Sequence, residues 1–250
     1  MPATPAWPPK SLPRLFVRHA LSTGAQIELD AGQANYLGNV MRLGVGSELL
    51  VFDDRSGEWL ARIASAAKKR MSVTIEHRTR EAESVPDVWL AFAPVKRAQT
   101  DWLVEKATEL GAARLMPVIT HRTIAERVRL DRLESIAVEA AEQCGRTRLP
   151  AIAKPATLKQ LLEERDAARS LYFADENGGE PPSNAFEPGP ALILIGPEGG
   201  FTDDERERVR AAKNAVPISL GPRVLRAETA ALAALATYMA VAGDWRLIDS

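Results

Sequence analysis

The first 80 or so residues contain short apolar and β-branched runs separated by turn-forming residues. The predicted strands are RLFVRH, SELLVFDD, GEWLARIAS and MSVTIEHRTR. The stretch from Asp53 to Gly57 supplies turn chemistry between the second and third runs, which predicts a hairpin. AGQANYLGNVMRLG, ahead of this hairpin, has apolar residues at helical spacing. We therefore predict a small, mostly β domain over residues 14–83.

From residue 84 to residue 250 the pattern changes to alternating strands and helices. The predicted strands are VWLAFAPV, ARLMPVI, SLYFAD, ALILI and VPISL. The predicted helices are TDWLVEKATELG, LDRLESIAVEAAEQCG, TLKQLLEERDAA, DDERERVRAAKNA and a last long helix from about Ala227. Residues 175–190 are rich in glycine and proline and are predicted to form a loop. This alternation is typical of an α/β domain with a parallel sheet.

Composition limits the class of protein but does not identify a binding partner. The 250 residues are 46% hydrophobic and 26% charged, as in an ordinary globular protein. Residues 1–13 are a proline-rich tail without the apolar core of a signal peptide, and the apolar segment from Thr229 to Gly243 is too short to span a bilayer. With a single cysteine, Cys144, no internal disulfide is possible, so we expect a cytoplasmic protein. Since the net charge is -1, RNA binding would depend on local basic clusters.

The stretch LILIGPEGGFTDDE, residues 192–205, combines a buried strand, a glycine turn and a helix start. Thr202 is a predicted N-cap, and Glu205 completes a capping box. The turn lacks the G-x-G-x-x-G spacing, and the chain has no GK[ST] motif. Glu198 and the acids that follow it oppose a phosphate at this helix start. A cationic nucleoside such as S-adenosylmethionine fits better, although GPEGG as a simple tight turn remains an alternative.

A second strand, turn and helix follow in VPISLGPRVLRAETAAL. GPEGG followed by LGPRVLRAETA resembles the signature of the RsmE family, the 16S ribosomal RNA uracil-N3 methyltransferases of the SPOUT class. EKATELGA and EAAEQCGR also resemble internal motifs of that family. The resemblance runs from about Arg14 to the last helix.

The resemblance implies a PUA-like β-barrel domain followed by a SPOUT domain with a trefoil knot, and a homodimer that uses the apolar part of its last helix as a contact. It also implies S-adenosylmethionine as cofactor, held by the SLYFAD, IGPEGG and LGPRVLR loops. Carried onto this chain, the cofactor-binding residues are Phe173, Ile195, Gly196, Glu198, Gly199, Gly200, Leu220, Gly221, Val224 and Leu225.

Arg226 and Glu198 are the catalytic candidates. Methylation at N3 of uracil requires loss of the imide proton, and a guanidinium at Arg226 would stabilise the charge that develops on O2 and O4. An ion pair between Arg226 and Glu228 is the structural alternative. Glu198 could accept the proton, contact ribose hydroxyls of the cofactor, or serve only its own turn. The base stays unassigned, because water or a residue of a second subunit would also serve.

RNA contacts have weaker signals. The candidate residues are Arg14, Arg18, the run Lys68, Lys69 and Arg70, and the pair Arg78 and Arg80. Arg146 and Arg148 are further candidates near the active side, and Arg122 is a weaker one. Each is also interpretable as a surface charge, but the candidates within residues 14–80 could bind phosphates as a set on a PUA-like domain. The three histidines are isolated, so we predict no metal site.

The sequence thus predicts an enzyme that methylates N3 of a uridine in 16S rRNA of the small ribosomal subunit. Two alternatives remain open. One is a SPOUT ribose 2'-O-methyltransferase, which shares the cofactor. The other is a ribosome assembly factor that has the fold without the activity.

Overall fold

The computed structural model describes residues 12–67, 70–124 and 128–246. Its contacts divide the chain into two compact units. The first unit takes the chain up to Glu83 together with Gly145–Arg148, and the second takes Ser84–Cys144 and the chain from Leu149 onward. The return of Gly145–Arg148 to the first unit is not predicted by the sequence. None of the helices in these residue ranges has the length and apolar character needed to cross a membrane.

The first unit is a five-stranded sheet. Its strands are β1 (Arg14–Phe16), β2 (Gln26–Leu29), β3 (Glu48–Phe52), β4 (Glu58–Ala67) and β5 (Arg70–Arg80), in the order β1-β3-β4-β5-β2. The predicted hairpin is confirmed, because β3 and β4 pair in antiparallel register. The predicted helix begins as α1 (Ala31–Asn35) and continues as a π-helical turn, Tyr36–Val40. β2 was not predicted; it pairs with β5 and buries Ile27 and Leu29.

A buried carboxylate ties Gly145–Arg148 to this first unit. Arg14 Nε donates to Glu58 Oε2 at 2.6 Å, and Arg80 reaches the same oxygen at 3.4 Å. The two arginines also donate to backbone carbonyls, Arg14 to that of Arg146 at 2.9 Å and Arg80 to that of Gly145. Both guanidinium groups therefore join the segment to the edge of the sheet.

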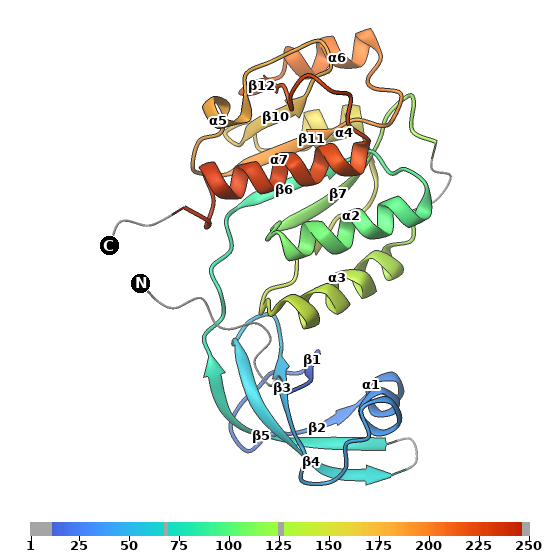
Figure 1. Cartoon of the computed structure of the whole chain (residues 1–250), viewed down its shortest axis with the longest axis vertical. Coiled ribbons are helices and arrows are strands. Elements are labelled where there is room, and N and C mark those ends of the chain that lie inside the picture. Colours follow the sequence, from blue (N-terminus) through green and yellow to red (C-terminus); the bar gives the residue numbers. More distant parts are fainter. Residues whose placement is uncertain (1–11, 68–69, 125–127, 247–250) are drawn as a thin grey trace. The chain divides into compact units, whose positions relative to one another are not determined.

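The second unit is an α/β domain built on a parallel sheet (Figure 1). Every pairing between its named strands is parallel, and the order is β12-β10-β11-β6-β7-β8, with β9 paired to β7. The predicted parallel sheet is confirmed. The strands are β6 (Val88–Phe92), β7 (Arg114–Ile119), β8 (Ala151–Ile152), β9 (Ala156–Thr157), β10 (Ser170–Ala174), β11 (Ala191–Ile195) and β12 (Ala215–Ile218). The helices are α2 (Arg97–Glu109), α3 (Leu130–Cys144), α4 (Leu158–Glu164), α5 (Pro182–Ala185), α6 (Asp203–Arg210) and α7 (Ala227–Val241).

The sheet of the second unit is covered by helices on both faces, and β11 shows why. Successive side chains of a strand point to opposite faces. Ala191, Ile193 and Ile195 pack into the core beneath α2, α3 and α7, whereas Leu192 and Leu194 pack into the core beneath α4 and α6. β11 is buried at all five positions, which explains its continuous apolar sequence. In Figure 1, α2, α3 and α7 lie side by side on one face of the sheet.

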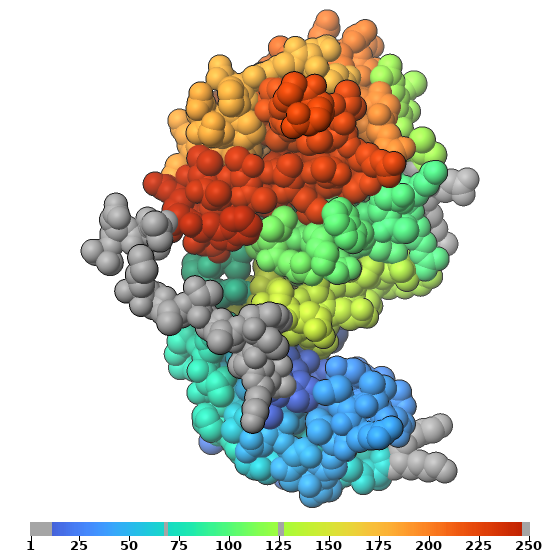
Figure 2. Space-filling model, viewed as in Figure 1, coloured from blue at the N-terminus to red at the C-terminus, as the bar shows by residue number. Residues whose placement is uncertain are grey.

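Helix α7 buries much of its apolar surface within its own unit. It packs against α2 and β11, and Ala231, Ala234, Leu235 and Met239 are fully buried. Figure 2 shows α7, in red, next to the green α2 on the surface of this unit. Packing within the chain therefore accounts for a large part of the apolar run that the sequence assigned to a subunit contact.

Candidate functional site

A cavity of about 210 Å³ lies at the carboxyl ends of three neighbouring strands, β10, β11 and β12. Three loops form its wall: the turn after β10, the GPEGG turn after β11 and the LGPRVLR loop after β12. The start of α7 closes it through Ala227 and Ala230. In open α/β sheets, ligands bind at this edge, where the loops beyond the strands diverge. The three loops are those that the sequence analysis assigned to a cofactor.

Most of the predicted cofactor-binding residues line this cavity. They are Ile195, Gly196, Glu198, Gly200, Leu220, Gly221, Val224 and Leu225. Two do not. Phe173 is fully buried in the core beneath α4 and α6, because the alternation along β10 turns it to the face opposite Tyr172. Gly199 lies on the outer side of its turn, where its carbonyl accepts a hydrogen bond from Arg122 Nη1 at 2.5 Å.

Two contacts hold the GPEGG turn in place. Arg122, after β7, donates to the Gly199 carbonyl from one side. The capping box predicted at the start of α6 is confirmed, because Thr202 Oγ1 accepts from the Glu205 backbone N–H at 3.2 Å and Glu205 Oε2 accepts from that of Thr202 at 3.0 Å. The other oxygen of Glu205 accepts from the His121 N–H at 2.8 Å. The turn is thus fixed to both α6 and the loop after β7.

Two features of the structure favour glycine at position 200. Its backbone has φ +69, in the left-handed region. A Cβ at this position would also lie 2.6 Å from both carboxylate oxygens of Glu176, which lines the same cavity. A side chain at this position would therefore have to displace the Glu176 carboxylate.

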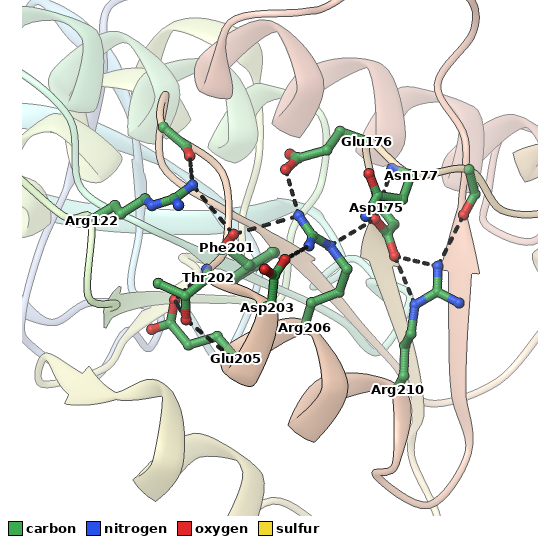
Figure 3. Close-up of polar contacts among 12 residues, drawn as sticks. Arg122, Asp175, Glu176, Asn177, Phe201, Thr202, Asp203, Glu205, Arg206 and Arg210 are labelled. Carbon is green, nitrogen blue, oxygen red and sulfur yellow. Dashed lines mark hydrogen bonds and ion pairs between the residues drawn. The ribbon is translucent and has the colours of Figure 1, made fainter.

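The loop after β10 is held by a buried ionic network that the sequence analysis missed (Figure 3). The Asp175 side chain is 0% exposed; it lies 3.3 Å from Arg206 Nε and accepts from Arg210 Nη2 at 2.6 Å. Arg206 also donates to Glu176 Oε1 at 2.6 Å and to Asp203 Oδ1 at 2.8 Å. Figure 3 shows the Arg206 guanidinium between these three carboxylates. Two arginines of α6 thereby fix the two acids that the loop after β10 contributes to the cavity wall.

The cavity is acidic. Asp175, Glu176 and Glu198 line it, and Arg223 is the one basic residue among its lining residues. Arg206 and Arg210 offset Asp175 and Glu176, whereas Glu198 is exposed and forms no hydrogen bond or ion pair with any residue that the structure describes. The site therefore favours a neutral or cationic ligand, because a phosphate would meet carboxylates on two of its loops, those after β10 and β11.

Comparisons with known proteins agree with this geometry. The family model of the RNA methyltransferase domain matches residues 81–239, and that of the RNA methyltransferase PUA domain matches residues 29–76. Ribosomal RNA small subunit methyltransferase E of Rickettsia conorii is 32% identical over 229 residues, which cover 89% of this chain and 93% of the relative. The chain belongs to the ribosomal RNA small subunit methyltransferase E family.

Solved structures of similar proteins also resemble the structure of this chain. The methyltransferase E of Neisseria gonorrhoeae, crystallised with S-adenosyl methionine, superposes with a TM-score of 0.84 at 27% identity and covers 94% of this chain and 100% of that one. A putative methyltransferase of Legionella pneumophila, solved with SAM, has a TM-score of 0.82 at 30% identity and covers 91% and 97%. The predicted fold class, a PUA-like domain followed by a SPOUT-type α/β domain, is confirmed.

Arg226 lies at the rim of the cavity rather than in its wall. It is the N-cap of α7, between the lining residues Leu225 and Ala227, and its side chain is exposed. Glu228 is buried, and its Oε2 has no hydrogen-bond partner among the described residues, so the alternative ion pair with Arg226 is not observed. The structure therefore leaves the Arg226 guanidinium available to a molecule bound next to the cavity.

The predicted RNA-binding residues separate into three groups. Arg14 and Arg146 are almost buried: Arg14 pairs with Glu58, and Arg146 Nε lies 3.7 Å from a carboxylate oxygen of Glu83. Arg18 and Arg70 are exposed on the first unit. Lys68 and Lys69 lie outside the described residues. In the ranges that the structure describes, no cluster of three histidine, cysteine or acidic side chains is suited to a metal ion.

Proposed function

We propose that this chain transfers the methyl group of S-adenosylmethionine to N3 of a uridine in 16S rRNA of the small ribosomal subunit. One observation carries the proposal: the acidic, glycine-walled cavity at the carboxyl edge of β10, β11 and β12 suits a cationic nucleoside without phosphate. Membership in the methyltransferase E family and likeness to proteins solved with this cofactor support it.

Different residues of the cavity wall would contact different parts of the cofactor. The backbone of the two glycine turns would line the adenosine, and Glu176 and Glu198 would face the positive sulfonium. The cofactor supplies an activated methyl group, so the protein contributes mainly orientation. In the transfer, the N3–methyl bond forms as the sulfur–methyl bond breaks, and the sulfur leaves as a neutral thioether.

Arg226 is proposed to stabilise the uracil. Loss of the N3 proton places negative charge on O2 and O4, and the exposed guanidinium at the rim can donate hydrogen bonds to one of them. Glu198, in the cavity wall, is a candidate for the proton acceptor or for the contact with the ribose. Loss of a proton acceptor lowers kcat, whereas loss of a ribose contact weakens cofactor binding, so experiment can separate these two roles of Glu198.

Membership in the family supports further proposals about assembly, chain topology, location and RNA binding. We propose a homodimer, a trefoil knot formed around the loops of the cavity, and action in the cytoplasm on the small subunit. The first unit is proposed to bind RNA through its exposed basic residues, with Arg18 and Arg70 as the described candidates.

The test is to incubate the protein with labelled S-adenosylmethionine and small subunits that lack the modification, digest the RNA and identify the labelled nucleoside. We expect the label in 3-methyluridine. Label in a 2'-O-methyl nucleoside would make the protein a ribose methyltransferase. Cofactor binding without transfer would make it an assembly factor.

A further inference from the structure

A second, larger cavity, of about 400 Å³, lies between the start of α2 and the start of α3. It is lined by Pro94, Val95, Lys96, Arg97, Thr100, Asp101, Val128, Arg129, Arg132 and Leu133. Its floor is apolar, because Val95 and Leu133 are buried members of the core beneath α2, α3 and α7. None of these residues lines the acidic cavity.

The second cavity is basic. Four cationic side chains line it, Lys96, Arg97, Arg129 and Arg132, against a single carboxylate, that of Asp101. Arg132 neutralises Asp101 through hydrogen bonds of 2.6 and 2.9 Å. Arg129 is paired with Asp131 at 2.5 Å, so Lys96 and Arg97 remain beyond these two pairs, and an anion that entered the cavity would meet a net positive charge.

Lys96 and Arg97 have the greatest freedom to meet a ligand. Both are exposed, and the Lys96 side chain forms no hydrogen bond or ion pair with the described part of the chain. Arg97 approaches Asp101 only at 4.0 Å. The first turn of α2 contains no acidic residue and has no side-chain cap, so the positive end of the helix adds to the same potential.

The basic and acidic cavities lie on neighbouring strands at the same edge of the sheet. β6 and β11 pair in parallel register, with Phe92 opposite Ile195. One residue further, the Ala93 N–H donates to the Ile195 carbonyl at 3.0 Å. Ile195 lines the acidic cavity, and Pro94 and Val95 line the basic one. A polymer that reached one cavity would therefore pass close to the other.

We propose that the basic cavity binds a backbone phosphate of the RNA segment that carries the target uridine. The inference rests on the proposed function and names a contact that positions its substrate. Opposite charges at the two cavities select opposite ligands: the acidic one takes a cationic cofactor and repels phosphate, and the basic one takes phosphate. Arginine and lysine suit this role because they donate several hydrogen bonds to phosphate oxygens.

The test compares the double variant Lys96→Ala, Arg97→Ala with the wild type and with a control, Lys159→Ala, Arg208→Ala. The control removes the same charge from exposed positions on α4 and α6 that line neither cavity. Dissociation constants for small subunits that lack the modification are measured at several salt concentrations, and cofactor affinity is measured alongside.

For Lys96→Ala, Arg97→Ala we expect roughly tenfold weaker binding of subunits, and a slope of log affinity against log salt that is shallower by about one, since a phosphate contact is lost. Cofactor affinity and the control should stay as in the wild type. Unchanged affinity and slope in the double variant would overturn the proposal. Failure of the proposed function itself would look different, because the wild type would then not transfer methyl to the subunits.

A second measurement separates RNA from an acidic protein segment as occupant. Phosphates of the small-subunit RNA are ethylated at random, and RNA captured by each protein is mapped. We expect one or two ethylated phosphates near the target uridine to block capture by the wild type but not by the double variant. Identical patterns would overturn the proposal. If the double variant lost cofactor binding through misfolding, Arg129→Ala, which removes another exposed cation of the cavity, would be tested in its place.

Discussion

Arg206 on α6 and Asp175 after β10 form a buried ion pair, with 3.3 Å between Nε and Oδ1. The Asp175 side chain is 0% exposed, and Arg206 also holds Glu176, which lines the same cavity. The proposed cofactor site therefore depends on an arginine that does not itself line the cavity.

Replacing Arg206 tests this dependence. Arg206→Ala leaves buried carboxylate charge with fewer partners, so the free energy of unfolding should fall by about 3 kcal/mol. Urea denaturation measures the change. The control is Arg208→Ala on the same helix, where the side chain is exposed and the expected change is within about 0.5 kcal/mol. Equal stability of the two variants would contradict a structural role for the ion pair.

Glu198→Gln tests the electrostatic account of cofactor choice. The sulfonium of S-adenosylmethionine is positive, whereas the thioether of S-adenosylhomocysteine is neutral. Removal of the carboxylate charge should weaken binding of the first by about tenfold, near 1.4 kcal/mol, and leave the second nearly unchanged. Calorimetric titration of both ligands measures this. Equal losses for the two would instead place Glu198 on the ribose hydroxyls that they share.

Gly200→Ala tests the close approach of the two loops. The left-handed backbone costs a non-glycine residue about 1–2 kcal/mol, and the new Cβ must displace the Glu176 carboxylate. Gly221→Ala shares the backbone penalty, at φ +103, but its Cβ would meet open space. We expect both variants to lose stability and Gly200→Ala to lose about tenfold more cofactor affinity. Similar cofactor affinities in the two variants would mean that displacement of Glu176 does not affect cofactor binding.

Arg226→Ala tests the proposed stabilisation of the uracil. The residue lies outside the cavity wall, so cofactor affinity should change little. If its guanidinium stabilises charge only in the transition state, kcat should fall by about 10²–10³. Methyl transfer to small subunits, measured at saturating cofactor, gives kcat. Transfer at the rate of the wild type would remove Arg226 from the mechanism.

Local sequence signals predicted the elements of the second unit and the position of its cavity. Apolar β11, the capping box of Thr202 and Glu205, and the two glycine turns each carry their signal within a few residues. Parallel strands bring their carboxyl ends to one edge of the sheet. The sequence alone therefore sufficed to predict that the turns after these strands lie close together. The missed elements are short, such as the one-turn α5 inside the predicted loop and the four-residue strand β2.

Long-range pairs were not predictable in this way. The sequence DDERERVR is typical of a solvent-exposed helix. Only the tertiary fold places Asp175 next to this helix, and Arg206 is buried as a result. Phe173 was assigned to the cofactor from its loop, but the alternation along β10 decides its face, and that face is opposite to the one with Tyr172. The side of a strand that meets a ligand depends on the packing of both helix layers, which a single sequence does not specify.

The central claim, methylation of N3 of one uridine, is tested most directly by primer extension on small-subunit RNA. A methyl group at N3 blocks the Watson–Crick edge, so reverse transcriptase stops there. Subunits that lack the modification are incubated with the protein and S-adenosylmethionine, and their RNA is copied. We predict a new stop at a single uridine, absent without cofactor and strongly reduced with Arg226→Ala. Read-through of every uridine, in subunits that have nevertheless accepted methyl label, would contradict the account.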